Sequence, residues 1–402
     1  MRRWTKLCAV SLLALGLGCP GPRQVSPVPG AEPELRIAIA VGGTTASIGG
    51  PESGELFVSD AASGLPVGSV PAGVRWVVRP DSADPARLRL IKPDSTRTDA
   101  VRGIAVVNVT ENRFVVANGR RYRGRITITS GRGAGGVGGL TLINRVKLES
   151  YVAGVVGPEI GARRTEELNA VLAQAIVSRS FALKNRGRWE AFGFDAYADT
   201  RDQVYLGMAV ETPQVWDAVR RTAGVDEAFG TARERPYLRP VSDESGGGGG
   251  HYYCDISPRF RWREEWDGSE LRAILSRTLA SVTPLAGDGM QRITDISVSR
   301  KTRSGRVGEL RIVFERGDVR IPGPDVRAVL RPEADRWLSS TAFELTASKT
   351  NGAVTRLVAA GAGAGHGVGM CQWGAIGRAR AGHDFRKILS TYFPGTKIEK
   401  IY

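Results

Sequence analysis

The chain is poor in cysteine. Four cysteines occur among 402 residues, and Cys8 lies in an apolar run at the very start of the chain. If Cys19 marks the end of a removed leader, only Cys254 and Cys371 remain free in the folded part. Two cysteines are too few for a scaffold built from disulfides, so the fold must depend on a hydrophobic core. The length is ample for a large core and usually corresponds to two lobes.

The apolar run at the N-terminus is too short for a full transmembrane helix. It extends from Leu7 to Leu17, and three basic residues precede it, which together indicate an export signal. The run ends in Leu-Gly-Leu-Gly-Cys, which resembles a bacterial lipoprotein cleavage site; an ordinary secretory signal is the alternative. We therefore expect residues 1–19 to be a signal peptide that ends at a lipidated Cys19. The exported protein would lie in the cell envelope or periplasm, anchored to a membrane through that lipid.

Several other function classes lack their sequence signatures. The net charge is +15, but basic residues are scattered rather than clustered with aromatics, so nucleic-acid binding is not indicated. A basic surface on an exported protein instead suits an anionic envelope. No G-x-S-x-G supports a serine hydrolase. The stretch Gly131–Gly136 matches G-x-G-x-x-G, but a strand pattern follows it where a dinucleotide site needs a helix, so we reject it as a cofactor site.

The distribution of patterns predicts an α+β fold. Residues 20–34 are rich in proline and predict a tether. Short alternating segments divided by Gly, Pro, Asn and Asp predict an antiparallel β lobe over residues 35–143. Residues 144–402 mix helical and strand patterns and are expected to form a catalytic core joined to that lobe.

The stretch from Lys147 to Lys184 contains two helical patterns separated by a short break. Pro158 lacks an amide hydrogen and disfavours the helical conformation at Gly157, so we expect the first helix to end there. Glu159 would then lie in the break, against an apolar helix end, where partial desolvation raises the pKa of a carboxyl group toward that of a general acid. A solvated loop carboxylate is the common alternative. On the second helix Arg179 falls on the apolar stripe and needs a partner, and we expect it close to Glu159.

These residues resemble the signature of the SpoIID/LytB family of cell-wall proteins, the stage II sporulation protein D type. The resemblance rests on the valine-rich helix before Pro158-Glu159 and on the following "AVLAQAIVSRSFAL". Gln203, Tyr205 and Gly207 are similar to the family's Gln-x-Tyr-x-Gly. "GHGVGMCQ", from Gly365 to Gln372, is nearly identical to the family's Gly-His-Gly-Val-Gly-Met-Ser-Gln, with cysteine where relatives commonly have serine.

The resemblance covers most of the mature chain and implies a lytic transglycosylase that cleaves peptidoglycan. Such an enzyme would hold glycan strands, stripped of stem peptides, in a groove between the β lobe and the helical core. Glu159 would serve as the single catalytic acid and base and produce 1,6-anhydro-muramyl ends. Substrate binding is assigned to Arg179, Gln203, Tyr205, His366 and Gln372. No cofactor is required for this chemistry. A hydrolytic glycosidase would normally need a second carboxylate, for which Asp199 and Asp202 are candidates.

Two rival classes stay open at this point. The protein could be a non-catalytic peptidoglycan binder that activates a cell-wall amidase. It could also be a metal-dependent hydrolase using His251, Cys254 and His366. His251 and Cys254 have the spacing of zinc ligands, but two ligands do not complete a tetrahedral site, and no carboxylate-rich metal motif accompanies them.

Overall fold

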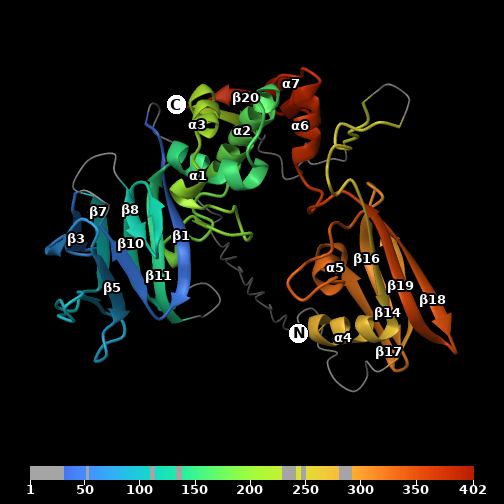
Figure 1. Cartoon of the computed structure of the whole chain (residues 1–402), viewed down its shortest axis with the longest axis horizontal. Coiled ribbons are helices and arrows are strands. Elements are labelled where there is room, and N and C mark those ends of the chain that lie inside the picture. The colour runs from blue at the N-terminus through green and yellow to red at the C-terminus, as the bar shows by residue number, and fades with distance from the viewer. Residues whose placement is uncertain are drawn as a thin grey trace, which may run out of the picture.

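The computed structural model describes residues 31–50, 54–108, 114–132, 138–228, 241–245, 250–279 and 292–402. The predicted signal peptide with Cys19, most of the tether and most of the Gly131–Gly136 motif lie outside these residues. The described chain forms two lobes joined near the segment from Gly365 to Gln372, which we call the glycine-rich motif (Figure 1). Helices cover the upper part of the first lobe in Figure 1. The predicted α+β class is confirmed.

The first lobe contains two antiparallel sheets whose strands come mainly from residues 34–147. The larger sheet has the order β12 (Ala196–Tyr197), β1 (Glu34–Gly43), β11 (Gly138–Lys147), β10 (Arg125–Arg132), β7 (Gly103–Asn108), β3 (Leu56–Asp60) and β4 (Pro66–Val70), with only the short β12 running parallel to its neighbour. The second sheet has the order β6 (Leu88–Ile91), β5 (Arg75–Pro80), β2 (Ala46–Gly49), β8 (Val115–Ala117) and β9 (Arg120–Tyr122). As predicted, a strand rather than a helix follows the Gly131–Gly136 motif.

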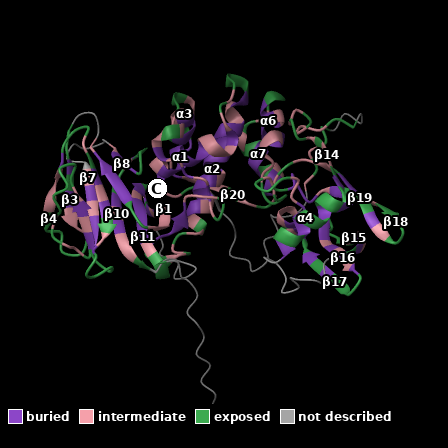
Figure 2. Ribbon diagram, turned by 60° about the horizontal axis from the view of Figure 1, so that its bottom comes forward, coloured by how far each residue is buried: buried purple, intermediate pink, exposed green. Residues whose placement is uncertain are grey.

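Helices pack directly on this sheet structure and share its core. They are α1 (Leu148–Ile160), α2 (Leu168–Lys184), α3 (Pro213–Arg221), α6 (Gln372–Arg380) and α7 (Phe385–Tyr392), with short 3-10 turns η1 (Thr165–Glu167), η2 (Glu190–Phe192) and η3 (Gly207–Val210). The strands β13 (Val225–Ala228) and β20 (Lys397–Lys400) pair as a small antiparallel ribbon. One continuous buried cluster includes Ile128 and Leu142 from the sheets and Val155, Ile176 and Leu389 from the helices (Figure 2). The predicted boundary between residues 143 and 144 therefore does not separate two cores.

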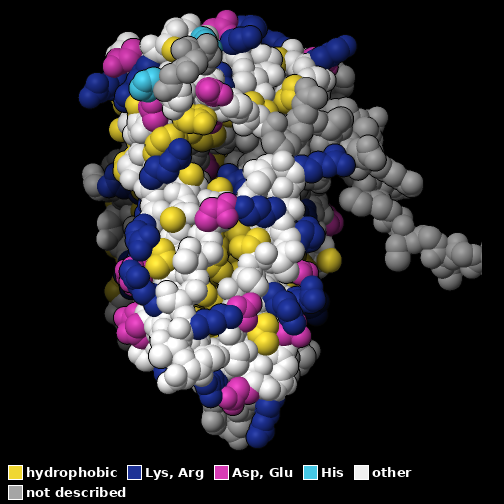
Figure 3. Space-filling model, turned by 90° about the vertical axis from the view of Figure 1, so that its right-hand side faces the viewer, with side chains coloured by type: hydrophobic (Ala, Val, Ile, Leu, Met, Phe, Trp, Pro, Cys, Tyr) yellow, Lys and Arg dark blue, Asp and Glu magenta, His cyan; other side chains and the backbone are white. Residues whose placement is uncertain are grey.

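The second lobe is inserted between α3 and α6 and has a core of its own. Its elements are β14 (Arg261–Asp267), α4 (Gly268–Thr278), β15 (Ile293–Lys301), β16 (Val307–Phe314), β17 (Gly317–Pro322), α5 (Gly323–Val329), β18 (Phe343–Thr350) and β19 (Ala353–Ala362). The strands form two three-stranded sheets, β14-β19-β18 and β15-β16-β17. Leu271 of α4, Leu310 of β16 and Leu357 of β19 are completely buried between them. On the face that Figure 3 shows, Lys and Arg are spread among Asp and Glu rather than gathered in one patch.

The first helix of the central stretch continues past the proline, which corrects the prediction that it ends at Gly157. Pro158 cannot donate to the carbonyl of Gly154, but the backbone N–H of Leu206 donates to that oxygen instead, at 3.2 Å. The helix ends only at Gly161, whose φ of 71° breaks the helical path. Glu159 therefore lies in the last turn of α1, not in a loop.

No helix within the described ranges combines the length and the apolar character needed to cross a membrane.

Candidate functional site

Glu159 is held on a rigid support. At Gly154 a Cβ atom would come within 2.4 Å of the Tyr205 ring, and at Gly157 one would come within 2.8 Å of Val210. The two glycines thus let the segment around η3 lie directly on α1, where Leu206 replaces the hydrogen bond that Pro158 cannot make. This contact fixes the final turn of α1 and the direction in which Glu159 leaves it.

The Glu159 carboxyl group has one hydrogen-bond partner and no counter-charge among the described residues. Gln372 Nε2 donates to its Oε2 at 3.0 Å. Burial raises the pKa of Glu159 above its usual value, and the Gln372 hydrogen bond opposes that rise. The negative end of the α1 dipole lies at the same helix terminus and disfavours the anion further. Surroundings that favour the protonated form of a carboxyl group suit it to donate a proton to a bound substrate.

Gln372 reaches Glu159 because the glycine-rich motif turns from β19 into α6. Cys371 caps α6, its Sγ accepting a hydrogen bond from Gly374 N at 3.3 Å, and Gln372 is the first residue of the helix. Gly367 has a φ of 74°, and a Cβ there would come within 2.4 Å of the Arg306 guanidinium carbon. The glycine permits both the turn and this close approach. The structure thus brings Glu159 and Gln372 together across 213 residues of sequence.

His366 lies in the same loop, six residues before Gln372. Its Nδ1 accepts a hydrogen bond from Val368 N at 3.1 Å, and no hydrogen bond joins it to Glu159 in the described structure. The residue is solvent-exposed. Partial desolvation of its ring and the positive charges of Arg327 and Arg306 lower the pKa of the imidazole. His366, which was assigned to substrate binding, therefore lies near cationic groups.

Gln203 and Tyr205 are buried behind α1. Gln203 accepts a hydrogen bond from the Tyr151 hydroxyl at 3.2 Å, and the Tyr205 hydroxyl donates to Asn144 Oδ1 at 2.8 Å. The rings of Tyr151 and Tyr205 lie 5.1 Å apart between centroids. With exposures of 7% and 2%, Gln203 and Tyr205 support the helix that carries Glu159 and have little surface left for a sugar.

Arg179 takes part in a buried ion pair at the opposite end of α1. Its Nε and Nη2 donate to Glu149 at 2.9 and 2.6 Å, and its Nη1 donates to the carbonyl of Val225 at 2.9 Å. The side chain is completely buried. Glu149 precedes Glu159 by ten residues, which is about 15 Å along a helix. The expectation that Arg179 lies beside Glu159 is therefore wrong, although the expectation of a carboxylate partner is confirmed.

The two candidate second carboxylates are engaged elsewhere. Asp202 accepts hydrogen bonds from the Trp189 indole and Tyr197 N, both at 2.9 Å, and pairs with Arg188. Asp199 pairs with the neighbouring Arg201, which lowers the pKa of its carboxyl group. Neither is hydrogen-bonded to Glu159 or to Gln372, so the described residues present Glu159 without a second carboxyl group in its hydrogen-bond network.

Cys254 meets Cys371 rather than His251. The thiols of Cys254 and Cys371 and a carboxylate oxygen of Asp243 all lie within 4.8 Å of one another. Cys371 donates to Cys254, which raises the pKa of Cys371 and lowers that of Cys254. The His251 side chain is 81% exposed and lies 3.7 Å from Asp255. Two thiols and a carboxylate fit the donor set of a zinc ion with one position open, and any resident zinc would be held by this thiol–carboxylate group.

Sequence reasoning missed Asp243 and Cys371 as neighbours of Cys254. No local signal could have found them, because the three residues lie on separate segments and meet only when α6 packs on the chain near residue 250. It also missed Asn144, which lies in a strand with alternating apolar residues and is fully buried under Tyr205.

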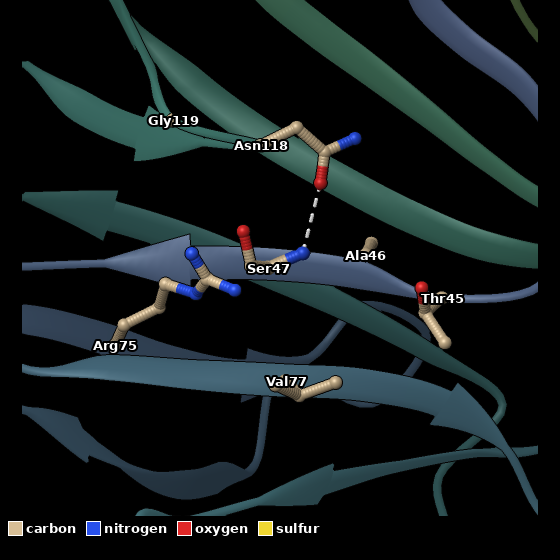
Figure 4. A pocket seen from close by; sticks show the side chains of 7 residues that line it. All are labelled: Thr45, Ala46, Ser47, Arg75, Val77, Asn118 and Gly119. Atoms are coloured by element: carbon tan, nitrogen blue, oxygen red, sulfur yellow. Dashed lines mark hydrogen bonds between the residues drawn. The ribbon is translucent and has the colours of Figure 1, made fainter.

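A separate hollow lies on the five-stranded sheet and carries no candidate chemistry. Its lining residues are Thr45, Ala46, Ser47, Arg75, Val77, Asn118 and Gly119 (Figure 4). Ser47 N donates to Asn118 Oδ1 at 2.9 Å and thereby joins β2 to the turn after β8. The lining contains no carboxylate, thiol or imidazole, so the candidate site remains the one around Glu159.

Comparison with known proteins identifies the segment that builds this site. Residues 137–226 match the family model of SpoIID, described as stage II sporulation protein. This segment is therefore similar to the SpoIID family. The matched segment contains α1 and α2 with Glu159, Arg179, Gln203 and Tyr205, whereas His366 and Gln372 come from beyond it. Residues 200–369 match a second model, a domain of unknown function (DUF8618), which includes the inserted lobe.

The proteins to which the chain is similar include two bacterial relatives. An uncharacterized protein of Brachyspira hyodysenteriae is 28% identical over 289 residues, which cover 64% of this chain and 68% of the relative. The amidase enhancer of Bacillus subtilis is 38% identical over 66 residues, 16% of this chain and only 9% of the enhancer. The similarity to the enhancer is thus confined to a short part of that protein.

Proposed function

We propose that this chain acts on the bacterial cell wall as a lytic transglycosylase that cleaves peptidoglycan glycan strands. The observation that carries the proposal is Glu159, a partly buried carboxyl group with a raised pKa, one amide partner and no counter-charge among the described residues. The SpoIID match and the similarity to a cell-wall protein, the amidase enhancer, support the substrate class. The location that suits this function is the cell envelope, where lipidation of Cys19 would anchor the chain.

The reaction needs a single group that first gives and then takes a proton. Glu159 donates its proton to the glycosidic oxygen between N-acetylmuramic acid and N-acetylglucosamine as the bond to the anomeric carbon breaks. The resulting carboxylate removes the proton of the muramyl 6-hydroxyl, whose oxygen forms the new bond to the anomeric carbon. The product is a 1,6-anhydro-muramyl end, no water is consumed, and Glu159 is again protonated. Gln372 orients the carboxyl group and stabilises its transient charge.

The decisive experiment is mass spectrometry of the products from purified glycan strands. A 1,6-anhydro end is lighter by one water than a hydrolysed reducing end, so the two mechanisms give different masses. Glu159→Gln should lower turnover about 10²–10⁴-fold, since an amide cannot exchange the proton. Glu166→Gln is the matched control, because Glu166 is 55% exposed and lies in the neighbouring 3-10 turn. Anhydro ends produced by Glu159→Gln at the wild-type rate would refute the assignment.

The amidase enhancer provides a second candidate function. A peptidoglycan binder that stimulates an amidase would need to hold the glycan strand but would not need the proton chemistry of Glu159. In that case neither wild type nor Glu159→Gln would make anhydro ends, and both would increase the rate of a cell-wall amidase equally. A matched stimulation assay with both proteins therefore separates the two functions.

A further inference from the structure

Two segments of chain connect the inserted second lobe to the first lobe, and each carries a cysteine. Cys254 lies on the segment that enters the second lobe ahead of β14, and Cys371 lies in the glycine-rich motif, on the segment that leaves the lobe after β19. The two segments meet at the base of the lobe, where Gly363 N donates to Phe260 O at 3.1 Å. A bond between the two thiols would therefore close a loop that contains every helix and strand of the second lobe.

The surrounding backbone holds the two cysteines close together. Tyr253, next to Cys254, lies against α6, where a Cβ at Gly377 would come within 1.9 Å of the Tyr253 carbonyl oxygen. Tyr253 N also donates to the carbonyl of Asp243 at 2.8 Å, which fixes this segment from its other side. Cys371 is fixed in turn as the cap of α6. Because each thiol is attached to an ordered segment, the two have a high effective concentration for each other.

The two sulfur atoms are within reach of a disulfide bond. They lie within 4.8 Å of each other, and the Cys371 thiol donates a hydrogen bond to Cys254. The bond in a disulfide is about 2.05 Å long, so rotation of the side chains and a small shift of the chain bring the sulfurs together. Both side chains are only partly buried, which leaves them accessible to an oxidant in solution.

A disulfide suits this group of side chains better than a metal ion does. Zinc would need the Asp243 carboxylate as its third ligand. The Oδ1 atom of Asp243 already accepts a hydrogen bond from Arg378 Nη2 at 3.2 Å and another from the Tyr392 hydroxyl. Arg378 also places a positive charge beside the carboxylate, which weakens its attraction for a cation. The two thiols are therefore better matched to each other than to a shared metal.

We propose that Cys254 and Cys371 form a disulfide once the chain is exported, and that this bond ties together the two connections of the second lobe. The inference goes beyond the proposed function and needs only the oxidising surroundings that an exported protein meets. Because the enclosed loop is long, the bond removes much conformational freedom from the unfolded chain. It also lies one residue before Gln372, so it fixes the helix start from which that side chain donates to Glu159.

The bond forms by exchange with an external disulfide that acts as the oxidant. The hydrogen bond from Cys371 favours the thiolate of Cys254, which attacks one sulfur of the oxidant and displaces the other. Cys371 then loses its proton and attacks Cys254 in the mixed disulfide, which releases the second sulfur of the oxidant. Two electrons thus pass from the cysteines to the oxidant, which leaves as two thiols that carry the two protons of the cysteines.

The first test maps the thiols of the full chain, produced with its own export signal and purified from the envelope fraction. Free thiols are blocked with N-ethylmaleimide at lysis, and the protein is digested without reductant for mass spectrometry. The expected result is a linked pair of peptides that contain Cys254 and Cys371, lighter by two hydrogen atoms than the reduced pair. The peptide map also distinguishes this bond from one to Cys19. Maleimide on both Cys254 and Cys371, with or without zinc retained by the protein, would overturn the proposal.

The second test uses the purified full chain and does not depend on export. The reduced chain is equilibrated with equal amounts of oxidised and reduced glutathione, and the thiols are mapped in the same way. A structural disulfide resists reduction by glutathione, so nearly every molecule should carry the bond. A chain that stays mainly in the dithiol form would overturn the proposal.

The matched variant for the effect on stability is Cys371→Ser, which removes the bond but keeps a side-chain acceptor that can cap α6. Closure of so long a loop should raise the Tm of oxidised wild type by about 3–10 °C above that of the variant. In the presence of a phosphine reductant the two Tm values should be nearly equal. A difference that persists in reductant would show that packing, not a bond, is responsible. None of these results depends on the formation of anhydro ends, so failure of the proposed function is recognised separately.

Discussion

The bond between Gln372 and Glu159 allows the acid–base assignment to be tested without removal of the acid. Gln372 Nε2 donates to the carboxylate at 3.0 Å, so it stabilises the charged form and holds the pKa of Glu159 lower than burial alone would set it. Gln372→Ala deletes this donor. The pKa of Glu159 should therefore rise further.

The size of the shift follows from the strength of one hydrogen bond to a charged group. Such a bond contributes about 1.5–3 kcal/mol, and water can partly replace the amide because Glu159 is only partly buried, which leaves about 1 kcal/mol. Loss of this stabilisation of the anion is the reason why the pKa of Glu159 should rise. Gln372→Glu places a carboxylate where the amide was and should shift the pKa in the same direction by more.

The assay is the pH dependence of kcat/KM, which reports the ionisation of the free enzyme. The first step requires protonated Glu159, so activity falls as the pH rises through its pKa. In Gln372→Ala the alkaline limb should move to higher pH, even though maximal turnover decreases. An unmoved limb, or a limb moved to lower pH, would show that Glu159 is not the ionising group that controls catalysis.

The same pKa shift predicts how the stability of the fold depends on pH. The folded-state pKa of Glu159 is raised, so its contribution is fully present below the unfolded value of about 4.5 and is lost as the pH rises through the folded-state value. In acid, the Tm of Glu159→Gln should therefore equal that of wild type. At neutral pH, the Tm of the variant should be equal or slightly higher. A lower Tm for the variant at neutral pH alone would contradict the sign of the shift.

Four further predictions concern the surroundings of the site. Gly154→Ala inserts a methyl group 2.4 Å from the Tyr205 ring and should lower the free energy of unfolding by about 1–3 kcal/mol, measured by urea titration. Arg179→Met leaves Glu149 without its cation and should lower the free energy of unfolding by about 3 kcal/mol, while turnover per folded molecule stays unchanged. A selective loss of kcat would refute the structural role. Cys19→Ala should release the protein from membranes on fractionation, and an unchanged distribution would exclude the lipid anchor. Treatment with a chelator should leave the formation of anhydro ends intact, whereas a loss that zinc restores would assign the thiol–carboxylate group a catalytic metal.

Strands with alternating apolar and polar residues were predictable because their sequence signals are local. The segment predicted to form an antiparallel β lobe, residues 35–143, consists mainly of strands. The helix α6 was not predicted, since Gly374 and Gly377 in its interior lower helix propensity. The fold requires both glycines nevertheless: a Cβ at Gly377 would come within 1.9 Å of the Tyr253 carbonyl oxygen, and one at Gly374 within 2.0 Å of the Tyr392 hydroxyl. Tertiary packing thus overrides the local preference.

The candidate site was predictable only in part, because its partners are distant in sequence. The pattern around Pro158 located Glu159 correctly at an apolar helix end but placed the helix terminus too early, since the compensating donor, Leu206, lies 52 residues after Gly154. Arg179 was correctly expected to need a carboxylate, yet periodicity cannot decide which one. Glu149 is its partner because α2 packs beside α1. Arg179 of α2 thereby lies next to the start of α1, which carries Glu149, and next to Val225 of β13. Such choices are made by packing and leave no pattern in one segment.

The loop before Gln372 connects the acid–base site to the second lobe. It is bonded to that lobe through Gly363 N to Phe260 O, at 3.1 Å, and through Gly365 N to Ser339 O. Gln372 itself is the first residue of α6, which packs with α1 in the core of the first lobe. The 3.0 Å hydrogen bond between Gln372 and Glu159 is therefore held by one core, and contacts within the first lobe set the pKa of Glu159.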